Sequence, residues 1–321
     1  MPVLVLADHS EGKFKNAAFE LISYGKSIAM MANTKLIVAT VRAKDISELS
    51  AFGPDKVVNI VNERLAVFNA KAIADALSQL AEKESADMIV LDSSNNSKYL
   101  APLLAVNLNA GMVSGVTEVP SSLNPFVVKR VAFSSKAFVH TEIKSAKKII
   151  CLGKNSFGIK ENQSTPASEE FTASLADDDF KISLKSVEKT SGKITIADAD
   201  VVVSGGRGLK GPENWGMVES LAEVLGAATA CSKPVSDLHW RPHSEHVGQT
   251  GKPVASNLYI AIGISGAIQH LAGVNASKCK VVINTDHEAP FFKAADYGVV
   301  GDAFEVVPKL IEKLKEFKRT H

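Results

Sequence analysis

Residues 200–211 read Asp-Val-Val-Val-Ser-Gly-Gly-Arg-Gly-Leu-Lys-Gly, an apolar run that passes directly into a glycine-rich loop. The run at 200–203 has the length and composition of a strand that is buried on both faces of a parallel sheet. A helical pattern over 213–225 follows the loop, and Gly226 is suited to end that helix. This order of strand, glycine loop and helix predicts a βαβ arrangement with a ligand at the carboxyl end of the first strand.

The alternation of strands and helices continues from this stretch to the end of the chain. It predicts a parallel sheet covered by helices, which is a doubly wound α/β domain. The expected strands are 227–230, 257–262, 280–283 and 297–300, with a helix opening over 267–271 and a final amphipathic helix over 303–317.

The first half of the chain shows the same alternation and predicts a second parallel-sheet α/β domain. Its expected strands are 3–7, 35–41, 57–61 and 88–91, and its expected helices are 14–32, 67–81 and 99–108. After Gly111, short β-rich segments follow without a helix of useful length between them, at 113–119, 126–133, 137–143 and 148–152. These segments predict added β-hairpin strands or an antiparallel edge on the parallel sheet.

The 321 residues are enough for two domains, each with its own core. Residues 153–176 are rich in Asn, Ser, Thr, Lys and Glu and poor in large apolar side chains, which is typical of a linker or an exposed loop. One more strand is expected within 177–196. We therefore predict an N-terminal domain of residues 1–190 and a C-terminal domain of residues 191–321, with the boundary near Thr190.

The overall composition excludes several classes of protein. The 36 Lys and Arg residues balance 35 Asp and Glu residues, so the net charge of +1 provides no broad basic face for nucleic acid. No apolar run reaches the length of about 20 residues that a membrane helix needs. The first residues, MPVLVLADHS, lack the pattern of a secretion or import signal, so we expect a cytoplasmic protein without membrane insertion.

The cysteines Cys151, Cys231 and Cys279 are odd in number, widely spaced and set among apolar neighbours. That pattern does not make a disulfide framework, and no CxxC motif is present. We expect three buried or half-buried thiols in a reducing compartment.

Arg207 stands in the middle of the glycine-rich loop and offers a forked cation to a phosphate or a ring system. In NAD-binding domains an acidic residue follows such a loop by about 20 residues. Here the next strand ends instead at Cys231, Ser232 and Lys233, which counts against NAD and leaves an NADP-binding form open. The structural alternative is an ordinary glycine-rich turn with a solvated arginine.

Further loops at predicted strand ends carry polar groups. Gln249 and Thr250, in the stretch VGQTGK, suit the edge of a heteroaromatic ring or form a simple polar turn. Residues 263–270, GISGAIQH, lead into a helix as an anion site requires, and His270 is either a ligand contact or a structural histidine. Asn284 and Asp302 suit ribose or adenine, but each could equally form a turn or cap a helix.

Two other polar stretches are expected to be structural. His239, His243 and His246 lie in a loop that contains Pro242, without a helical face, so we expect surface imidazoles and no metal site. Residues 93–97, SSNNS, follow a strand and could hold a nucleotide, but we expect a strand-to-helix turn in which Ser97 or Asn96 caps the helix.

Taken together, the motifs SGGRGLKGPEN, VGQTGK, IAIGISGAIQHLAG, INTDHEAPFF and ADYGVVGD resemble, in this order, the C-terminal half of electron transfer flavoprotein alpha subunits. The resemblance implies an N-terminal α/β domain and a C-terminal doubly wound domain that binds FAD. It implies pairing with a beta subunit that holds AMP. It also implies an electron carrier without a substrate-converting site of its own, which moves electrons from acyl-CoA dehydrogenases and related flavoproteins to a membrane quinone oxidoreductase.

The resemblance also assigns FAD contacts. It places Arg207 over the flavin region, Ser232 against the isoalloxazine, Thr250 at flavin N5, and His270 near flavin O2. The implied cofactor-binding residues are Arg207, Ser232, Lys233, Val247, Gly248, Gln249, Thr250, Ser265, Gly266, Ala267, Ile268, Gln269, His270, Asn284, Asp302 and Ala303.

One position departs from the family pattern. Many members have an arginine after the serine, where this chain has Lys233. That arginine is thought to favour the anionic, one-electron-reduced flavin, and lysine keeps the charge without the planar fork. An NAD(P)-binding oxidoreductase or transhydrogenase-like domain, and a noncatalytic nucleotide-binding module, are the alternatives to an electron carrier.

Overall fold

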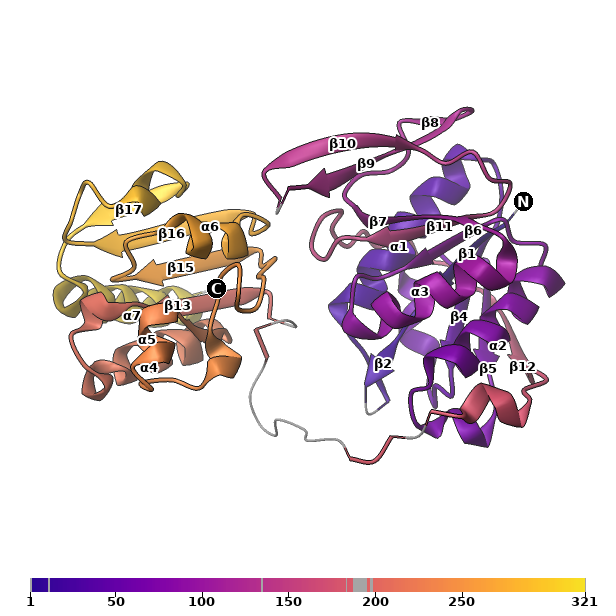
Figure 1. Ribbon diagram of the computed structural model, residues 1–321, viewed down its shortest axis with the longest axis horizontal. Helices are drawn as coiled ribbons and strands as arrows, with labels where there is room; N and C mark the ends of the chain where they lie inside the picture. The colour runs from indigo at the N-terminus through magenta and orange to yellow at the C-terminus, as the bar shows by residue number, and fades with distance from the viewer. Residues whose placement is uncertain are drawn as a thin grey trace. The chain divides into compact units, whose positions relative to one another are not determined.

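The computed structural model describes residues 2–10, 12–133, 135–182, 184–186, 195–196 and 199–320. The bulk of one compact unit lies within residues 1–187, and the bulk of a second lies within residues 188–321 (Figure 1). Each unit is built on its own sheet, so the predicted two-domain α/β class is confirmed. The boundary predicted near Thr190 falls outside the described residues.

The sheet of the first unit is parallel over most of its width. Its strand order is β10-β9-β7-β11-β6-β1-β4-β5-β12, and β8 pairs with β9. The parallel strands are β1 (Val3–Leu6), β4 (Leu36–Val41), β5 (Lys56–Ile60), β6 (Met88–Leu91), β7 (Gly111–Val116), β11 (Lys148–Leu152) and β12 (Ala167–Phe171). The antiparallel strands are β8 (Ser122–Leu123), β9 (Phe126–Ala132) and β10 (Ala137–Glu142), which confirms the added hairpin strands.

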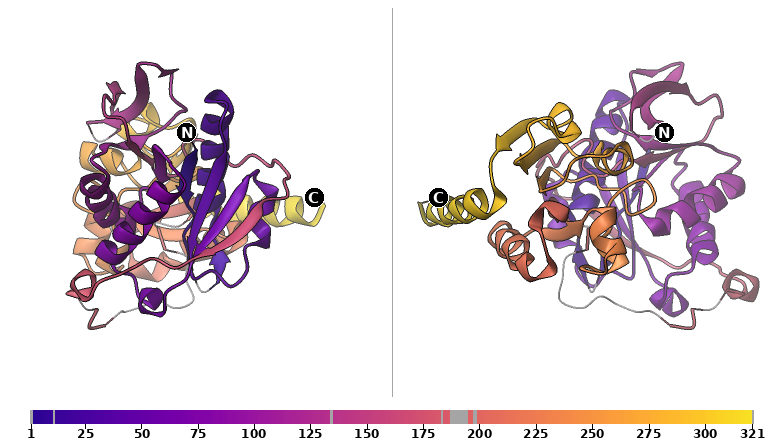
Figure 2. Two further views of the ribbon diagram at one scale, coloured as in Figure 1. Left: turned by 90° about the vertical axis from the view of Figure 1, so that its right-hand side faces the viewer. Right: turned by 60° about the vertical axis from the view of Figure 1, so that its left-hand side comes forward.

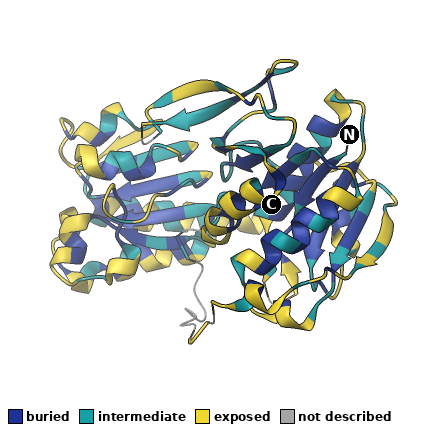
Figure 3. Cartoon of the chain, turned by 45° about the vertical axis from the view of Figure 1, so that its right-hand side comes forward, coloured by how far each residue is buried: buried dark blue, intermediate teal, exposed yellow. Residues whose placement is uncertain are grey.

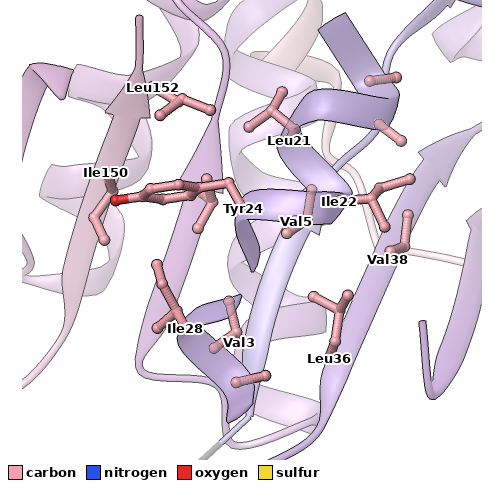
Figure 4. Close-up of a cluster of buried hydrophobic side chains, with 14 of the residues drawn as sticks. Val3, Val5, Leu21, Ile22, Tyr24, Ile28, Leu36, Val38, Ile150 and Leu152 are labelled. Atoms are coloured by element: carbon pink, nitrogen blue, oxygen red, sulfur yellow. The ribbon is translucent and has the colours of Figure 1, made fainter. Parts of the chain in front are cut away.

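Helix α1 (Asn16–Met31) packs on one face of this sheet, and helices α2 (Ala70–Lys83) and α3 (Asn95–Leu108) pack on the other. Tyr24 of α1 lies fully buried among the strands, and its hydroxyl donates to the carbonyl oxygen of Glu118 over 3.1 Å (Figure 4). Because alternate residues of β1 point to the two faces, Val3 and Val5 join the α1 side while Leu4 joins the α2 side.

Two short elements of the first unit correct the sequence prediction. Helix α3 begins at Asn95, four residues before the predicted start. Ser94 caps this helix, because its side chain accepts a hydrogen bond from the Ser97 N–H. The prediction that Ser97 or Asn96 is the cap was therefore wrong. The β2 (His9–Ser10) and β3 (Lys13–Phe14) ribbon occupies the turn before α1.

The segment 153–176 is not a linker throughout. Ala167–Phe171 forms β12, which pairs with β5 at the edge of the sheet, and Glu169 in it forms ion pairs with Lys56 and Lys83. Polar side chains concealed this strand, because an edge strand can expose them on both faces. Asp177–Phe180 is a 3₁₀ turn and not the predicted start of a strand; residues 183, 187–194 and 197–198 lie outside the described chain.

The second unit is built on a sheet whose strands are all parallel. The order is β14 (Ala228–Cys231), β13 (Val201–Gly205), β15 (Leu258–Ile262), β16 (Cys279–Asn284) and β17 (Tyr297–Val300). The chain passes from β13 to β14 on one side and then crosses to β15 on the other. The connections therefore diverge between β13 and β15, which is a topological switch point.

Helices cover both faces of this sheet, as the doubly wound prediction requires. Helices α4 (Gly216–Leu225), α5 (Lys233–Asp237) and α7 (Ala303–Thr320) pack on one face, and α6 (Ile268–Val274) packs on the other (Figure 1). Gly226 ends α4 at a φ of +65°, as predicted. Short 3₁₀ turns lie at Arg207–Leu209, Pro212–Asn214, His243–Glu245 and Pro290–Lys293.

The central strands of both sheets are buried, whereas β10, β12 and β17 and the outward faces of the helices are largely exposed (Figure 3). Helix α7 packs on the core of the second unit through buried Ala303 and Val307 and through half-buried residues as far as Leu314, and its last turns extend beyond the sheet (Figure 2, right). Within the described part of the chain, no helix combines the length and the apolar character needed to cross a membrane. Cys151 and Cys231 are buried free thiols, and Cys279 is a half-buried one, as predicted.

Candidate functional site

The loops that follow β13, β15 and β16 all leave the carboxyl edge of the second sheet, so they gather around the switch point. This edge is where open parallel sheets bind ligands. The loop 247–252 reaches the same edge from β14, because the Val247 N–H donates to the Cys231 carbonyl oxygen over 3.0 Å. Half of the residues predicted as cofactor contacts lie in these loops, and Ile268, Gln269 and His270 follow in the first turn of α6.

The glycine-rich loop after β13 packs its backbone directly on the loop after β15. The Gly206 N–H donates to the Ile262 carbonyl over 2.8 Å, and the Gly208 N–H donates to the Gly263 carbonyl over 3.0 Å. A Cβ atom on Gly206 would lie 2.2 Å from the Gly263 oxygen. These N–H groups therefore do not face a phosphate; the glycines of the GxGxxG pattern allow contact between two loops.

Two cations of this loop have different surroundings. The Arg207 side chain is exposed and has no ion-pair or hydrogen-bond partner among the described residues. The Lys210 ammonium lies 3.8 Å from a carboxylate oxygen of Asp302 and 4.8 Å from the centre of the Phe304 ring. Arg207 is thus the cation of this loop that is available to an anionic or aromatic ligand.

At the end of β14, the Ser232 N–H donates to the Gly205 carbonyl over 3.1 Å, which holds this turn against the end of β13. The Ser232 side chain is buried without capping α5, and Lys233 begins that helix with an exposed side chain. Burial raises the pKa of the Cys231 thiol to about 12. Cys231 therefore stays protonated at neutral pH and is not a nucleophile.

The loop 247–252 rests on α6. Its Gln249 N–H donates to the Gln269 carbonyl over 2.7 Å, and a Cβ atom on Gly273 would lie 2.6 Å from the Gly248 Cα. The side chains of Gln249 and Thr250 are exposed, and neither forms a hydrogen bond within the described part of the chain. Both are available to a ligand at this edge.

The loop after β15 is held by its carbonyl groups. The Ile264 carbonyl accepts from the Asn284 side-chain amide over 3.2 Å, and the Ser265 carbonyl accepts from the Phe291 N–H over 3.0 Å. Gly266 has a φ of +86° and packs against Phe291. By contrast, the N–H groups of residues 265–267 donate to no group among the described residues, and Ala267, Ile268 and Gln269 are exposed.

His270 lies in the first turn of α6 and is 7% exposed. Its Nε2 lies 3.0 Å from the hydroxyl oxygen of Tyr259, and its Nδ1 is buried without a hydrogen-bond partner among the described residues. Burial lowers the pKa of His270 to about 4; the positive charge that His246 can carry lowers it further, and the Val247 backbone acts in the opposite direction. The ring is therefore neutral at pH 7.

The last predicted contacts lie at the far strands. The Asn284 carbonyl accepts from the Gly301 N–H over 3.0 Å, which brings the ends of β16 and β17 together. The Asp302 carboxylate accepts from the Phe304 N–H over 3.0 Å, so it binds the first turn of α7, and Ala303 is buried at the start of that helix. The Asn284 side-chain oxygen also accepts from the Asp286 N–H over 3.1 Å, so both polar side chains have the turn-forming or capping contacts that the sequence left open.

Within the described ranges, no group of three or more His, Cys, Asp or Glu side chains is arranged to hold a metal ion. The ring centroids of His243 and His246 lie 5.2 Å apart, and His246 is buried, not at the surface as predicted. Sequence reasoning also missed Tyr259 and Phe291, which surround His270. Their only sequence signal is an aromatic residue in an apolar strand or loop, which usually indicates core packing.

Two family descriptions match the chain. Residues 3–176 match the electron transfer flavoprotein domain, and residues 195–275 match the electron transfer flavoprotein FAD-binding domain. The electron transfer flavoprotein subunit alpha of Bacillus subtilis (strain 168) is 34% identical over 316 residues, which cover 98% of this chain and 97% of that protein. The subunit of the same name from Syntrophomonas wolfei is 33% identical over 320 residues, which cover 97% of this chain and 98% of that protein. The acryloyl-CoA reductase electron transfer subunit beta of Anaerotignum propionicum is 31% identical over 353 residues, which cover 98% of this chain and 96% of that protein.

The residues at the carboxyl edge fit an FAD group. FAD has an anionic diphosphate, a hydroxylated ribityl chain and a flavin ring with acceptor oxygens and nitrogens, so it needs cations and donors. The edge supplies the Arg207 guanidinium, the Lys233 ammonium, the Thr250 hydroxyl and backbone N–H groups, and it contains the unpartnered Nδ1 of His270. The matches extend over nearly the whole length of the relatives and over both units. The chain therefore belongs to the family of electron transfer flavoprotein alpha subunits.

Proposed function

We propose that this chain is the FAD-carrying subunit of a heterodimer, which receives electrons from acyl-CoA dehydrogenases and related flavoprotein dehydrogenases and delivers them to a membrane quinone oxidoreductase. The beta subunit of the heterodimer binds AMP, and the complex works in the cytoplasm. The chain carries electrons and converts no substrate of its own. Family membership and the FAD-binding domain match support the carrier role.

The observation that carries the proposal is the convergence of polar groups without partners at one edge of the second sheet. The side chains of Arg207, Lys233, Gln249 and Thr250 are exposed, and these side chains form no hydrogen bond or ion pair within the described residues. Such a set of cations and hydrogen-bonding side chains, exposed together at a topological switch point, favours a large polar ligand.

We retain, as part of this proposal, the FAD contacts that the family resemblance implies. Arg207 lies over the flavin region, Ser232 and Lys233 approach the isoalloxazine, Thr250 donates at the flavin N5 side, and His270 approaches the flavin O2 side. The remaining contacts come from Val247, Gly248, Gln249, Ser265, Gly266, Ala267, Ile268, Gln269, Asn284, Asp302 and Ala303. FAD supplies the one- and two-electron chemistry when bound; the protein binds and orients it and sets its potential.

Residues 1–190 form the domain that contacts the partner subunit in this proposal, and residues 191–321 form the cofactor domain. The all-parallel second sheet supports this division, because its edge holds the predicted cofactor contacts. The glycine-loop N–H groups of Gly206 and Gly208 are already paired, which disfavours the alternative in which this loop binds the diphosphate of NAD(P).

The test is to co-express this chain with its beta subunit and to measure the visible spectrum and the FAD content of the purified complex. We expect one FAD for each heterodimer and its reduction by a reduced acyl-CoA dehydrogenase. A colourless complex that does not rebind added FAD contradicts the cofactor assignment. A yellow complex that accepts no electrons from an acyl-CoA dehydrogenase contradicts the proposed donor.

A further inference from the structure

A fully buried tyrosine lies beneath the first turn of α6. Tyr259 of β15 stacks on Phe291 with the ring centroids 6.3 Å apart and an interplanar angle of 3°. Its hydroxyl oxygen lies 3.0 Å from Nε2 of His270. This hydrogen bond connects the strand to the helix across the loop 263–267, so it fixes where α6 begins relative to β15.

The surroundings decide which atom donates. A buried hydroxyl needs an acceptor, and burial raises the pKa of Tyr259, so its proton is retained. The Oγ of Ser204, which also influences that pKa, reaches hydrogen-bond geometry with no described residue. Nε2 of His270 remains as the acceptor for the tyrosine hydroxyl.

The proton of the neutral imidazole then lies on the other nitrogen, because a neutral ring carries one N–H. The Val247 backbone interacts with the ring and raises its pKa, as an acceptor facing an N–H does. Even so, Nδ1 has no partner with hydrogen-bond geometry in the described part of the chain. A buried donor of this kind is complementary to a carbonyl oxygen.

We infer that Tyr259 is a positioning residue for the flavin site, which acts through His270: its hydroxyl donates to Nε2, holds the imidazole as the Nδ1–H tautomer and keeps the first turn of α6 on β15. The consequence for the cofactor rests on the function proposed above, in which His270 approaches a flavin carbonyl. The hydrogen bond itself belongs to this chain and can be measured separately.

The tautomer is read from long-range ¹H–¹⁵N correlation spectra of the heterodimer labelled with ¹⁵N-histidine. The His270 signals are assigned by their loss in a His270→Gln variant. We expect a protonated Nδ1 and a bare Nε2 in the wild type. A protonated Nε2 overturns the inference, and this result does not depend on the folding of any tyrosine variant.

The Tyr259→Phe variant removes the hydroxyl and keeps the ring that stacks on Phe291. We expect His270 to lose its single tautomer and FAD to bind about 3- to 10-fold more weakly, which is the effect of one lost buried hydrogen bond. Tyr297→Phe is the matched control, because Tyr297 is 68% exposed on β17, and neither readout should change. If Tyr259→Phe retains both the wild-type tautomer and the wild-type affinity, the inference is wrong.

The same samples separate this inference from the proposed function. A wild-type heterodimer that binds no flavin contradicts the proposed function. The histidine spectra of that heterodimer still decide whether Tyr259 donates to His270. Conversely, a flavin-loaded wild type with a protonated Nε2 retains the proposed function and rejects the role of Tyr259.

Discussion

Gly208 and Gly263 lie backbone against backbone: the Gly208 N–H donates to the Gly263 carbonyl over 3.0 Å, and a Cβ atom on Gly263 would lie 2.8 Å from the Gly208 Cα. Gly263 also has a φ of +62°, which L side chains rarely adopt. The contact connects the loops after β13 and β15 at the switch point. The shape of the carboxyl edge of the second sheet therefore depends on the absence of two side chains.

The first prediction concerns this contact. Gly263→Ala should lower the free energy of unfolding by about 1–3 kcal/mol, because the backbone is strained and the loops must separate. Denaturant unfolding and flavin content measure the two effects. Gly216→Ala is the control, since Gly216 begins α4 with open space around its Cβ position, and it should unfold at the same or higher denaturant concentration. Equal destabilisation by the two variants contradicts this account.

The second prediction concerns Arg207. Because its side chain has no partner among the described residues, Arg207→Ala should leave the thermal midpoint of the apo complex unchanged. The dissociation constant for FAD should rise about 10- to 100-fold, as expected from the loss of a charged hydrogen bond. Fluorescence titration of the apo complex gives the dissociation constant. Arg319→Ala, at the exposed end of α7, removes the same charge and should retain full affinity.

The third prediction concerns Lys233, which begins α5 directly after buried Ser232. Lys233→Ala should reduce the yield of one-electron-reduced flavin during photoreduction, because a nearby cation stabilises the anionic form. Lys233→Arg should raise that yield above wild type, since the guanidinium adds a planar pair of donors. Lys252→Ala is the control for Lys233→Ala, because it removes an exposed cation from the neighbouring loop 247–252. The idea fails if the alanine and wild-type spectra coincide while FAD is still bound.

The fourth prediction follows from the pKa of His270, which burial lowers from 6.5 to about 4. Below pH 6.5 the unfolded chain binds a proton that the folded chain does not bind, so stability falls as the pH decreases. Between pH of about 6.5 and 4 the loss should be on the order of 3 kcal/mol for this residue. Chemical unfolding at several pH values measures it.

His270→Gln provides the comparison for this pH dependence. The groups that face the ring, His246 and the Val247 backbone, are the same in both proteins, and burial also lowers the pKa of His246. The stability difference between wild type and variant should therefore be largest near neutral pH and shrink toward pH of about 4. A difference that does not vary with pH contradicts a neutral buried imidazole.

Strands and helices with a strong apolar pattern could be predicted from the sequence. The run in β15 and the glycine at the end of α4 led to correct elements, because burial on two faces and a left-handed helix end each restrict residue type. The strand β12 was missed, since its residues Ala-Ser-Glu-Glu-Phe show no apolar run. Its position is set by pairing with β5, and the apolar periodicity of a segment carries no information about which distant strand it pairs with.

The candidate site could be predicted only in part, because sequence motifs show which loops lie together but not which atoms of those loops are in contact. The motifs identified which loops gather at the sheet edge, because parallel strands place their carboxyl ends together. They did not show that the Gly206 and Gly208 N–H groups face another loop. They also did not show that Tyr259 reaches His270, because this contact depends on how α6 rests on β15 in three dimensions.

The strand β12 is attached to its sheet by backbone pairing with β5 and by a small cluster of charges. Glu169 forms ion pairs with Lys56, over 2.6 Å, and with Lys83, and these lysines lower the pKa of its carboxyl to about 2. Added salt screens such exposed pairs, whereas it does not weaken the apolar core between α1 and β1. High ionic strength should therefore loosen the end of the first unit before its centre, so that limited proteolysis in concentrated sodium chloride cuts first beside β12.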